Sequence, residues 1–325
     1  MRTGGRAAVL AGVMVTAAAL VTGCGGSVSN SGGGDAKKLV LIPGVANEPF
    51  YISMQCGAEA RAEQLGYSLD TQAPTQFDAS LQTPIVTGVI ANKPGAILIA
   101  PTHASAMASP ISQAKNSGIK VIEVDTALED TSIALSSIAS DNVAGGELAA
   151  QTLSKLVGGN GSVLVINTKA GTSTTDQRAQ GFEDELKRNH PGLVSLGVQY
   201  NNNEAAQAAS IVTATLAAHP DLVGIFATNL SSAEGAATGL RNAGKLGQVK
   251  VVGFDASPKQ VQDLKDGTVQ ALIAQNPGDI GKQGVDQAVA ALEGKPVTRT
   301  IQTDMIAITQ ENLSSNEQYF YKSGC

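Results

Sequence analysis

Short apolar runs alternate along the chain with longer stretches in which apolar residues recur every three or four positions. Runs of this kind are typical of buried strands, and the stretches between them are typical of amphipathic helices. Strand and helix in strict alternation predict an α/β fold with doubly wound, Rossmann-like parallel sheets. The expected strands are 38–42, 67–70, 96–100, 121–125, 162–166, 195–200, 223–227, 249–254 and 268–274, with a last one near Ile306. The expected helices are 49–65, 81–92, one ending at 116, 142–156, 174–189, 204–218, 231–243, 258–266 and 278–292.

Local signals fix several helix ends. Pro49 and Pro258 stand at first helical positions, where the missing N–H costs nothing, and Ser257 is the expected N-cap of the helix at Pro258. Gly66 is the expected stop of the first helix. Pro84 can be accommodated only in the first turn of its helix. The strands and helices are expected to form two α/β sheets of similar plan, and the chain is expected to return to the first sheet near its end.

Length and composition narrow the classes of protein. A chain of 325 residues is too long for one ordinary core, so two domains are expected. Apolar residues make up 42%, which is enough for a core throughout. The net charge of −6, with no basic block, argues against a nucleic-acid partner, which would need clustered lysine and arginine.

The N-terminus is typical of an exported protein. Arg2 and Arg6 precede an uncharged apolar run, 7–21, which is too short for a transmembrane helix and fits a signal peptide. The run ends in a sequence that resembles the bacterial lipobox, and Cys24 is the expected lipidation site. We expect a signal peptide over 1–23 and a flexible lipidated tether over 24–37, rich in Gly, Ser and Asn. The alternative is an ordinary secretory peptide with an incidental cysteine.

Two cysteines remain after Cys24. In an oxidising compartment a leftover pair suggests a disulfide, so we expect Cys56 and Cys325 to be bridged. Two free thiols, with Cys56 buried as a small apolar side chain, are the alternative.

The sequence lacks the common catalytic and cofactor-binding motifs. The sequence has no G-x-S-x-G, H-E-x-x-H or C-x-x-C motif. A partial P-loop at 239–245 lacks the following Ser or Thr and lies at a helix end. We therefore expect no cofactor, no metal and no enzymatic activity.

Polar and aromatic residues cluster where strands end. Asp125 and Asp255 close two apolar runs, and Gln275 ends another, at the sheet edge where open α/β sheets bind ligands. Carboxylates accept hydrogen bonds, Arg donates them and amides do both, so the set suits a solute with several hydroxyls. Without a paired base and nucleophile, binding is better supported than catalysis. The candidate ligand-binding residues are Glu48, Phe50, Tyr51, Asp125, Arg178, Asn203, Asn229, Asp255 and Gln275.

With these residues in place, the chain resembles the periplasmic sugar-binding proteins of the ribose and galactose type, the type I substrate-binding proteins of ABC importers. The resemblance covers about 38–304. It rests on Asn47-Glu48-Pro49-Phe50-Tyr51, the runs 121–125 and 138–146, Gly171-Thr172-Ser173 with Arg178 and 181–182, 219–221, 226–229, Val252-Gly253-Phe254-Asp255 and 273–275.

The resemblance implies two lobes joined by a three-strand hinge, closing over the ligand. It implies an N-terminal lobe of 38–140 plus 276–304, a C-terminal lobe of 141–275 plus 305–312, and a tail of 313–325. The implied function is capture of a sugar or polyol and delivery to an ABC import permease, by a monomer that touches the outer face of the cell membrane only through its lipid. A sensory receptor presenting its closed form to a histidine kinase or chemoreceptor is the alternative; a secreted glycoside-processing enzyme would need paired carboxylates at a fixed separation.

Two positions depart from the ribose-type pattern. Thr126 follows the first-lobe aspartate where that family has Arg, and Glu48 stands where it has Asn. These changes remove a cation and add an anion, which leaves Arg178 to face Glu48, Asp125 and Asp255. Either Glu48 points to solvent, or the ligand is a polyol or carries an amine.

Overall fold

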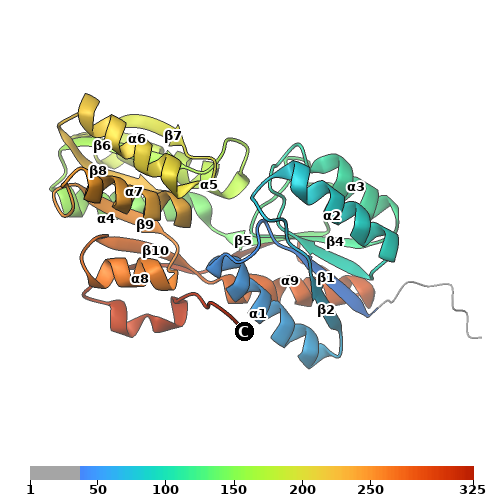
Figure 1. Cartoon of the computed structure of the whole chain (residues 1–325). Coiled ribbons are helices and arrows are strands. Elements are labelled where there is room, and N and C mark those ends of the chain that lie inside the picture. The colour runs from blue at the N-terminus through green and yellow to red at the C-terminus, as the bar shows by residue number, and fades with distance from the viewer. Residues whose placement is uncertain (1–36) are drawn as a thin grey trace, which may run out of the picture. The chain divides into compact units, whose positions relative to one another are not determined.

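The computed structural model describes residues 37–325, and two α/β lobes make up this part of the chain (Figure 1). The expected signal peptide, Cys24 and almost all of the tether lie outside the described residues. The first lobe contains a six-stranded, wholly parallel sheet in the order β11-β5-β4-β3-β1-β2. Its strands are β1 (Lys38–Ile42), β2 (Ser68–Thr71), β3 (Ala96–Ile99), β4 (Lys120–Val124), β5 (Ser136–Ser140) and β11 (Thr300–Thr303).

The second lobe repeats this plan with one antiparallel edge. Its strand order is β12-β10-β9-β8-β6-β7, and only β12 runs antiparallel to its neighbour. Its strands are β6 (Gly161–Asn167), β7 (Leu193–Tyr200), β8 (Leu222–Ala227), β9 (Lys250–Phe254), β10 (Ala271–Gln275) and β12 (Met305–Ile308). The chain passes from one sheet to the other after β5, after β10 and after β11, so three connections join the lobes.

Helices cover both faces of each sheet. Alternate residues of β1 point to opposite faces: Leu39 and Leu41 pack in the cluster with α1 and α9, while Val40 and Ile42 pack with α2 and α3. Burial on both faces explains why the strands read as continuous apolar runs. The helices are α1 (Pro49–Leu65), α2 (Ala79–Asn92), α3 (Ala108–Asn116), α4 (Asn142–Val157), α5 (Ser173–Asn189), α6 (Ala205–Ala218), α7 (Leu230–Asn242), α8 (Pro258–Lys265) and α9 (Pro277–Leu292).

The predicted fold class is confirmed, and two local expectations were wrong. Helix α2 begins at Ala79, capped by the Asp78 side chain, so Pro84 lies in its second turn rather than its first. The strand β11 was not predicted, because its four residues TIQT carry no apolar run and only Thr303 among them is fully buried.

Glycines let neighbouring helices approach closely. A Cβ on Gly146 of α4 would lie 2.1 Å from the backbone oxygen of Arg178 on α5, and a Cβ on Gly181 would lie 2.1 Å from the oxygen of Val143. The same reciprocal arrangement joins α1 and α9 through Gly57 and Gly281. Gly146 and Gly181 therefore allow α5 to lie close to α4, and this packing determines where α5 places Arg178.

Gly146→Ala is expected to lower the free energy of unfolding by about 1–3 kcal/mol, because the added methyl group must push α5 away. Urea unfolding measures this loss. Gly88→Ala in α2 is the matched control, since a Cβ there meets no heavy atom within 4 Å among the described residues. It should leave stability unchanged or raise it. Equal effects of the two substitutions would contradict the close-approach explanation.

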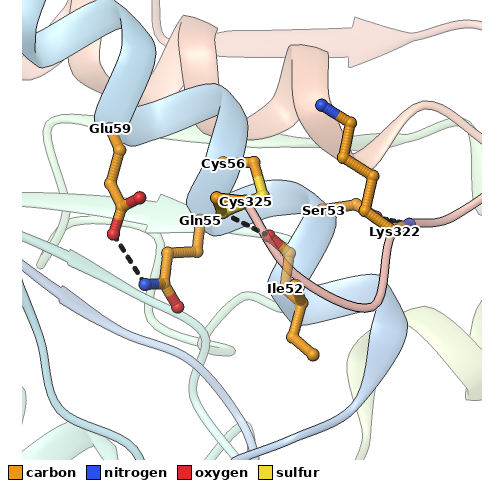
Figure 2. Close-up of a disulfide and its surroundings, with 7 residues drawn as sticks. All are labelled: Ile52, Ser53, Gln55, Cys56, Glu59, Lys322 and Cys325. Carbon is orange, nitrogen blue, oxygen red and sulfur yellow. Dashed lines mark hydrogen bonds between the residues drawn. A yellow bond between two sulfur atoms is a disulfide. The ribbon is translucent and has the colours of Figure 1, made fainter.

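The expected disulfide is present in the structure. Cys325, the last residue, is bonded to Cys56 in the second turn of α1 (Figure 2). Lys322 is tied to the same helix, since its backbone N–H donates to Ser53 Oγ at 2.7 Å. The C-terminal tail, which contains the short 3-10 turns Leu313–Ser315 and Glu317–Tyr319, therefore ends on the first lobe. Across residues 37–325, every helix is too short or too polar to cross a membrane.

Candidate functional site

One cavity is lined by all nine residues that the sequence singled out. They come from both lobes: the β1–α1 junction and the end of β4 on one side, and the ends of β7, β8, β9 and β10 with helix α5 on the other. The space open to the centres of water molecules is about 40 Å³. That is room for roughly three waters, or for one small solute that replaces them.

The two aspartates occupy equivalent places in the two lobes. Asp125 follows β4 with φ 66°, and Asp255 follows β9 with φ 80°. In each case the backbone N–H donates to the neighbouring strand, to Ile138 O at 2.8 Å and to Ile273 O at 2.9 Å. Aspartate tolerates this left-handed conformation better than most residues. The turn directs each carboxylate into the space between the lobes.

Three donors hold the carboxylate of Asp255. Its Oδ1 accepts from Gln275 Nε2 at 2.7 Å and from the Tyr321 hydroxyl at 3.0 Å. Its Oδ2 accepts from the backbone N–H of Leu230 at 3.0 Å, at the positive end of helix α7. Helix α8 has its own cap in Ser257, which forms a capping box with Gln260. Asp255 is therefore not the cap of α8.

Asp125 is held by one aromatic neighbour. The Tyr51 hydroxyl donates to Asp125 Oδ2 at 2.9 Å. Tyr51 packs edge-on against Phe50, with 5.2 Å between ring centroids. Both rings are buried and both line the cavity. The pair gives the cavity an apolar wall beside a carboxylate.

Arg178 is fixed from three sides and is 3% exposed. Its Nε donates to Asn142 Oδ1 at 2.8 Å and its Nη1 to Thr228 O at 2.9 Å. Its guanidinium lies 3.7 Å from the centroid of the Phe254 ring, a cation–π distance. Burial lowers the pKa of Arg178, and the carboxylates of Asp255 and Asp125 oppose that shift.

Two asparagines of the second lobe line the cavity, and their side chains are hydrogen-bonded to each other. Asn229 Nδ2 donates to Asn203 Oδ1 at 2.7 Å, and the Ser231 hydroxyl donates to the same oxygen at 2.7 Å. Asn229 Oδ1 accepts from the N–H of Ser232, so Asn229 also caps α7. These bonds fix which amide atoms remain to meet a ligand.

Glu48 lies in the cavity wall rather than pointing to open solvent, although it keeps partial exposure. It precedes α1 but makes no cap hydrogen bond. Burial raises its pKa to about 8, helped by repulsion from Asp255 and Asp125, while Asn203 opposes the shift. Burial also raises the pKa of Asp125 to about 6, against the lowering effects of Arg178 and Tyr51. Burial likewise raises the pKa of Asp255.

Threonines and Phe77 complete the lining, and sequence reasoning missed most of them. Thr168, Thr172 and Thr175 are at most 4% exposed, and their hydroxyls have no hydrogen-bond partner within residues 37–325. These hydroxyls are free to bind a polar solute. Threonine is common in loops and caps, so the only signal was the Gly171-Thr172-Ser173-Thr174 turn, which capping alone could explain. The remaining lining residues are Phe77, Thr126 and Thr174.

The two lobes also contact each other directly. Lys169 of the second lobe forms an ion pair with Asp78 of the first at 3.1 Å. The N–H of Ala104 donates to Gly171 O at 2.9 Å, and the N–H of Ala127 donates to Ser173 Oγ at 2.9 Å. The two lobes therefore meet directly beside the cavity in this structure.

The lining suits binding better than catalysis. It offers carboxylates, amides, hydroxyls and one guanidinium, without a histidine or cysteine beside them. Within the described residues, no three His, Cys, Asp or Glu side chains are grouped so as to hold a metal ion. The arrangement can bind several hydroxyls at once and place a ring against Phe50 and Tyr51.

Comparisons with known proteins point the same way. The family described as periplasmic binding protein domain matches residues 39–296. The ribose import binding protein RbsB of Escherichia coli is 32% identical over 277 residues, which are 84% of this chain and 90% of that protein. RbsB of Bacillus subtilis is 30% identical over 87% of this chain and 90% of its own length. These relatives are named as transport binding proteins, not as enzymes.

A solved structure is similar over nearly the whole described region. It is an ABC transporter solute-binding protein from Agrobacterium vitis bound with α-D-tagatopyranose, 42% identical, with a TM-score of 0.86. The match covers 88% of this chain and 99% of that one. A carbohydrate transporter solute-binding protein from Agrobacterium radiobacter, in complex with D-arabinose, is 28% identical with a TM-score of 0.82, over 86% and 97% of the two chains.

Proposed function

Because this chain belongs to the periplasmic binding protein family, we propose that it is an extracytoplasmic lipoprotein that captures a sugar or polyol and delivers it to an ABC import permease. One observation supports this most strongly: nine polar and aromatic side chains from both lobes line a single cavity. The sugars bound in two similar solved structures support a carbohydrate as the ligand. The lipobox-like sequence before Cys24 supports anchoring to the outer face of the membrane.

Each lining residue has a role in this proposal. Asp125 and Asp255 accept hydrogen bonds from sugar hydroxyls, and Arg178 donates to ring or hydroxyl oxygens. Phe50 and Tyr51 cover the apolar face of the ring. Asn203, Asn229 and Gln275 bind the remaining hydroxyls, and Glu48 binds one further group.

Capture works by hinge closure between the two lobes. The ligand binds residues of both lobes only when the lobes are together, so its binding free energy favours the closed form. We expect the closed form to present a surface to the permease that the open form does not. The monomer suffices for this, because both walls of the cavity belong to one chain.

A thermal-shift screen over D-ribose, D-tagatose, D-arabinose, amino sugars, polyols and amino acids tests the proposal. A ligand at 100 times its Kd should add about 2.7 kcal/mol of stability. We expect at least one carbohydrate to raise the unfolding temperature. A shift with amino acids alone would contradict the carbohydrate assignment.

Glu48 gives the capture step a pH dependence. In this structure burial raises its pKa to about 8, and we expect that pKa to fall toward the ordinary value of 4.5 when the lobes open to water. Between pH 4.5 and pH 8, closure on a neutral sugar therefore takes up a proton, so affinity falls as the pH rises through that window. We expect the Kd to rise on the order of tenfold from pH 6 to pH 7.5.

Titration calorimetry of the wild type and of Glu48→Gln measures this effect. The amide cannot ionise, so the variant should keep tight binding at pH 7.5 and lose most of the dependence. Asp125, with its pKa near 6, leaves a smaller residual slope of the same sign in both proteins. Identical slopes in the two proteins would show that Glu48 does not titrate on binding.

A further inference from the structure

The C-terminal tail reaches from one lobe to the other beside the cavity. The backbone N–H of Tyr321 donates to Ala256 O at 2.9 Å, in the second lobe directly after Asp255. The next residue, Lys322, is bound to Ser53 on helix α1 of the first lobe, and Cys325 is bonded to Cys56 on the same helix (Figure 2). The backbone of Tyr321 is therefore bound to the second lobe, and the residues that follow it are bound to the first lobe.

Tyr321 is 4% exposed, and its hydroxyl lies between two groups of the site. It accepts from the backbone N–H of Gln275 at 3.2 Å and lies 3.0 Å from Asp255 Oδ1. An amide N–H can only donate, so the hydroxyl proton is directed to the carboxylate. Hydrogen bonds linked in this way polarise and strengthen one another.

The ring of Tyr321 also contacts the aromatic wall. Its centroid lies 5.8 Å from that of Phe50, in an edge-to-face arrangement. The side chain thus touches a cavity-lining residue from each lobe, Phe50 and Asp255, although Tyr321 does not line the cavity itself.

We propose that Tyr321 is a positioning residue of the binding site, which orients the Asp255 carboxylate for the ligand while the disulfide-anchored tail holds Tyr321. This inference rests on the proposed function, because it assigns Asp255 to the ligand. Of the three donors to Asp255, the Leu230 N–H and the Gln275 amide come from the second lobe and its hinge strand. Tyr321 is the third donor and the only one supplied by the tail among the described residues. The same hydroxyl also satisfies the buried N–H of Gln275.

Tyr321→Phe removes the hydroxyl and keeps the ring, so the variant should fold. We expect it to weaken sugar binding roughly tenfold, because the Asp255 carboxylate loses a charge-assisted donor. Tyr319→Phe is the matched control: it deletes the same group two residues away, and no side-chain hydrogen bond of Tyr319 occurs within residues 37–325. Its Kd should stay within twofold of the wild type.

Titration calorimetry tests this, with whichever of D-ribose, D-tagatose, D-arabinose, the amino sugars and the polyols gives the largest thermal shift. The same substitution is then made in an Asp255→Ala background. If Tyr321 acts through Asp255, it should cost less than twofold there, whereas a general structural role would cost tenfold in both backgrounds.

Three results overturn the inference in distinguishable ways. A Tyr321→Phe variant that binds within twofold of the wild type removes the positioning role and leaves the proposed function standing. Equal losses in both backgrounds remove the action through Asp255. Failure of the wild type to bind any sugar, amino sugar or polyol of the thermal-shift screen counts against the proposed function itself, and the inference falls with it.

Discussion

Replacing Asp255 with alanine is expected to weaken sugar binding roughly tenfold to 100-fold. Three protein donors already occupy its carboxylate, which leaves about one acceptor position for a sugar hydroxyl. A hydrogen bond to a charged group contributes about 1.5–3 kcal/mol, which corresponds to about one to two factors of ten in Kd. Titration calorimetry at pH 7 measures the loss.

Asp266→Ala is the matched control, because Asp266 is an exposed aspartate of the same lobe that lies at the end of helix α8. It should leave the Kd unchanged. Asp255 also orders Leu230 and Tyr321, so the fold of the variant is checked by circular dichroism. A folded Asp255→Ala variant with wild-type affinity would show that Asp255 does not bind the ligand and only accepts the hydrogen bond from the first residue of α7.

Removing the disulfide should have the largest effect on stability. Cys56 and Cys325 are 269 residues apart, so the bond closes nearly the whole described chain into one loop. The chain-entropy estimate for so long a loop is roughly 5 kcal/mol, and measured losses are typically about 2–5 kcal/mol. We expect the Cys56→Ala, Cys325→Ala variant to lose stability in this range in urea unfolding.

Reductant provides the matching control. The wild type should become as unstable as the double variant in dithiothreitol, whereas the double variant should not respond. Equal stability of the oxidised wild type and the double variant would show that the disulfide restricts the unfolded chain too little to stabilise the fold.

The sequence predicted the two-sheet fold because the signals were local and repeated. Strands buried on both faces read as apolar runs, and Gly66 and Ser257 marked helix ends by their own chemistry. The strand β11 was not predicted, because the sequence TIQT has no apolar pattern of its own. It forms a strand by pairing with β5, and that contact depends on the tertiary structure. Pro84 was misplaced for a related reason: the Asp78 cap sets the start of α2 two residues before the expected position.

The candidate site was predictable where polar residues ended strands. Asp125, Asp255 and Gln275 were found because the carboxyl ends of parallel strands meet at one edge. The buried threonine hydroxyls and Tyr321 were not found, since neither residue type in a loop or polar tail signals burial. Tyr321 reaches Asp255 only because the tail folds back 66 residues later in the chain, and no local pattern encodes that contact.

A crystal structure of the protein grown with the sugar that gives the largest thermal shift tests the central claim most directly. We predict one unaltered sugar between the lobes, with its hydroxyls bound to both Asp125 and Asp255 and its ring against Phe50 and Tyr51. A sugar bound elsewhere, or one bound to a single lobe without touching both aspartates, would contradict capture by closure.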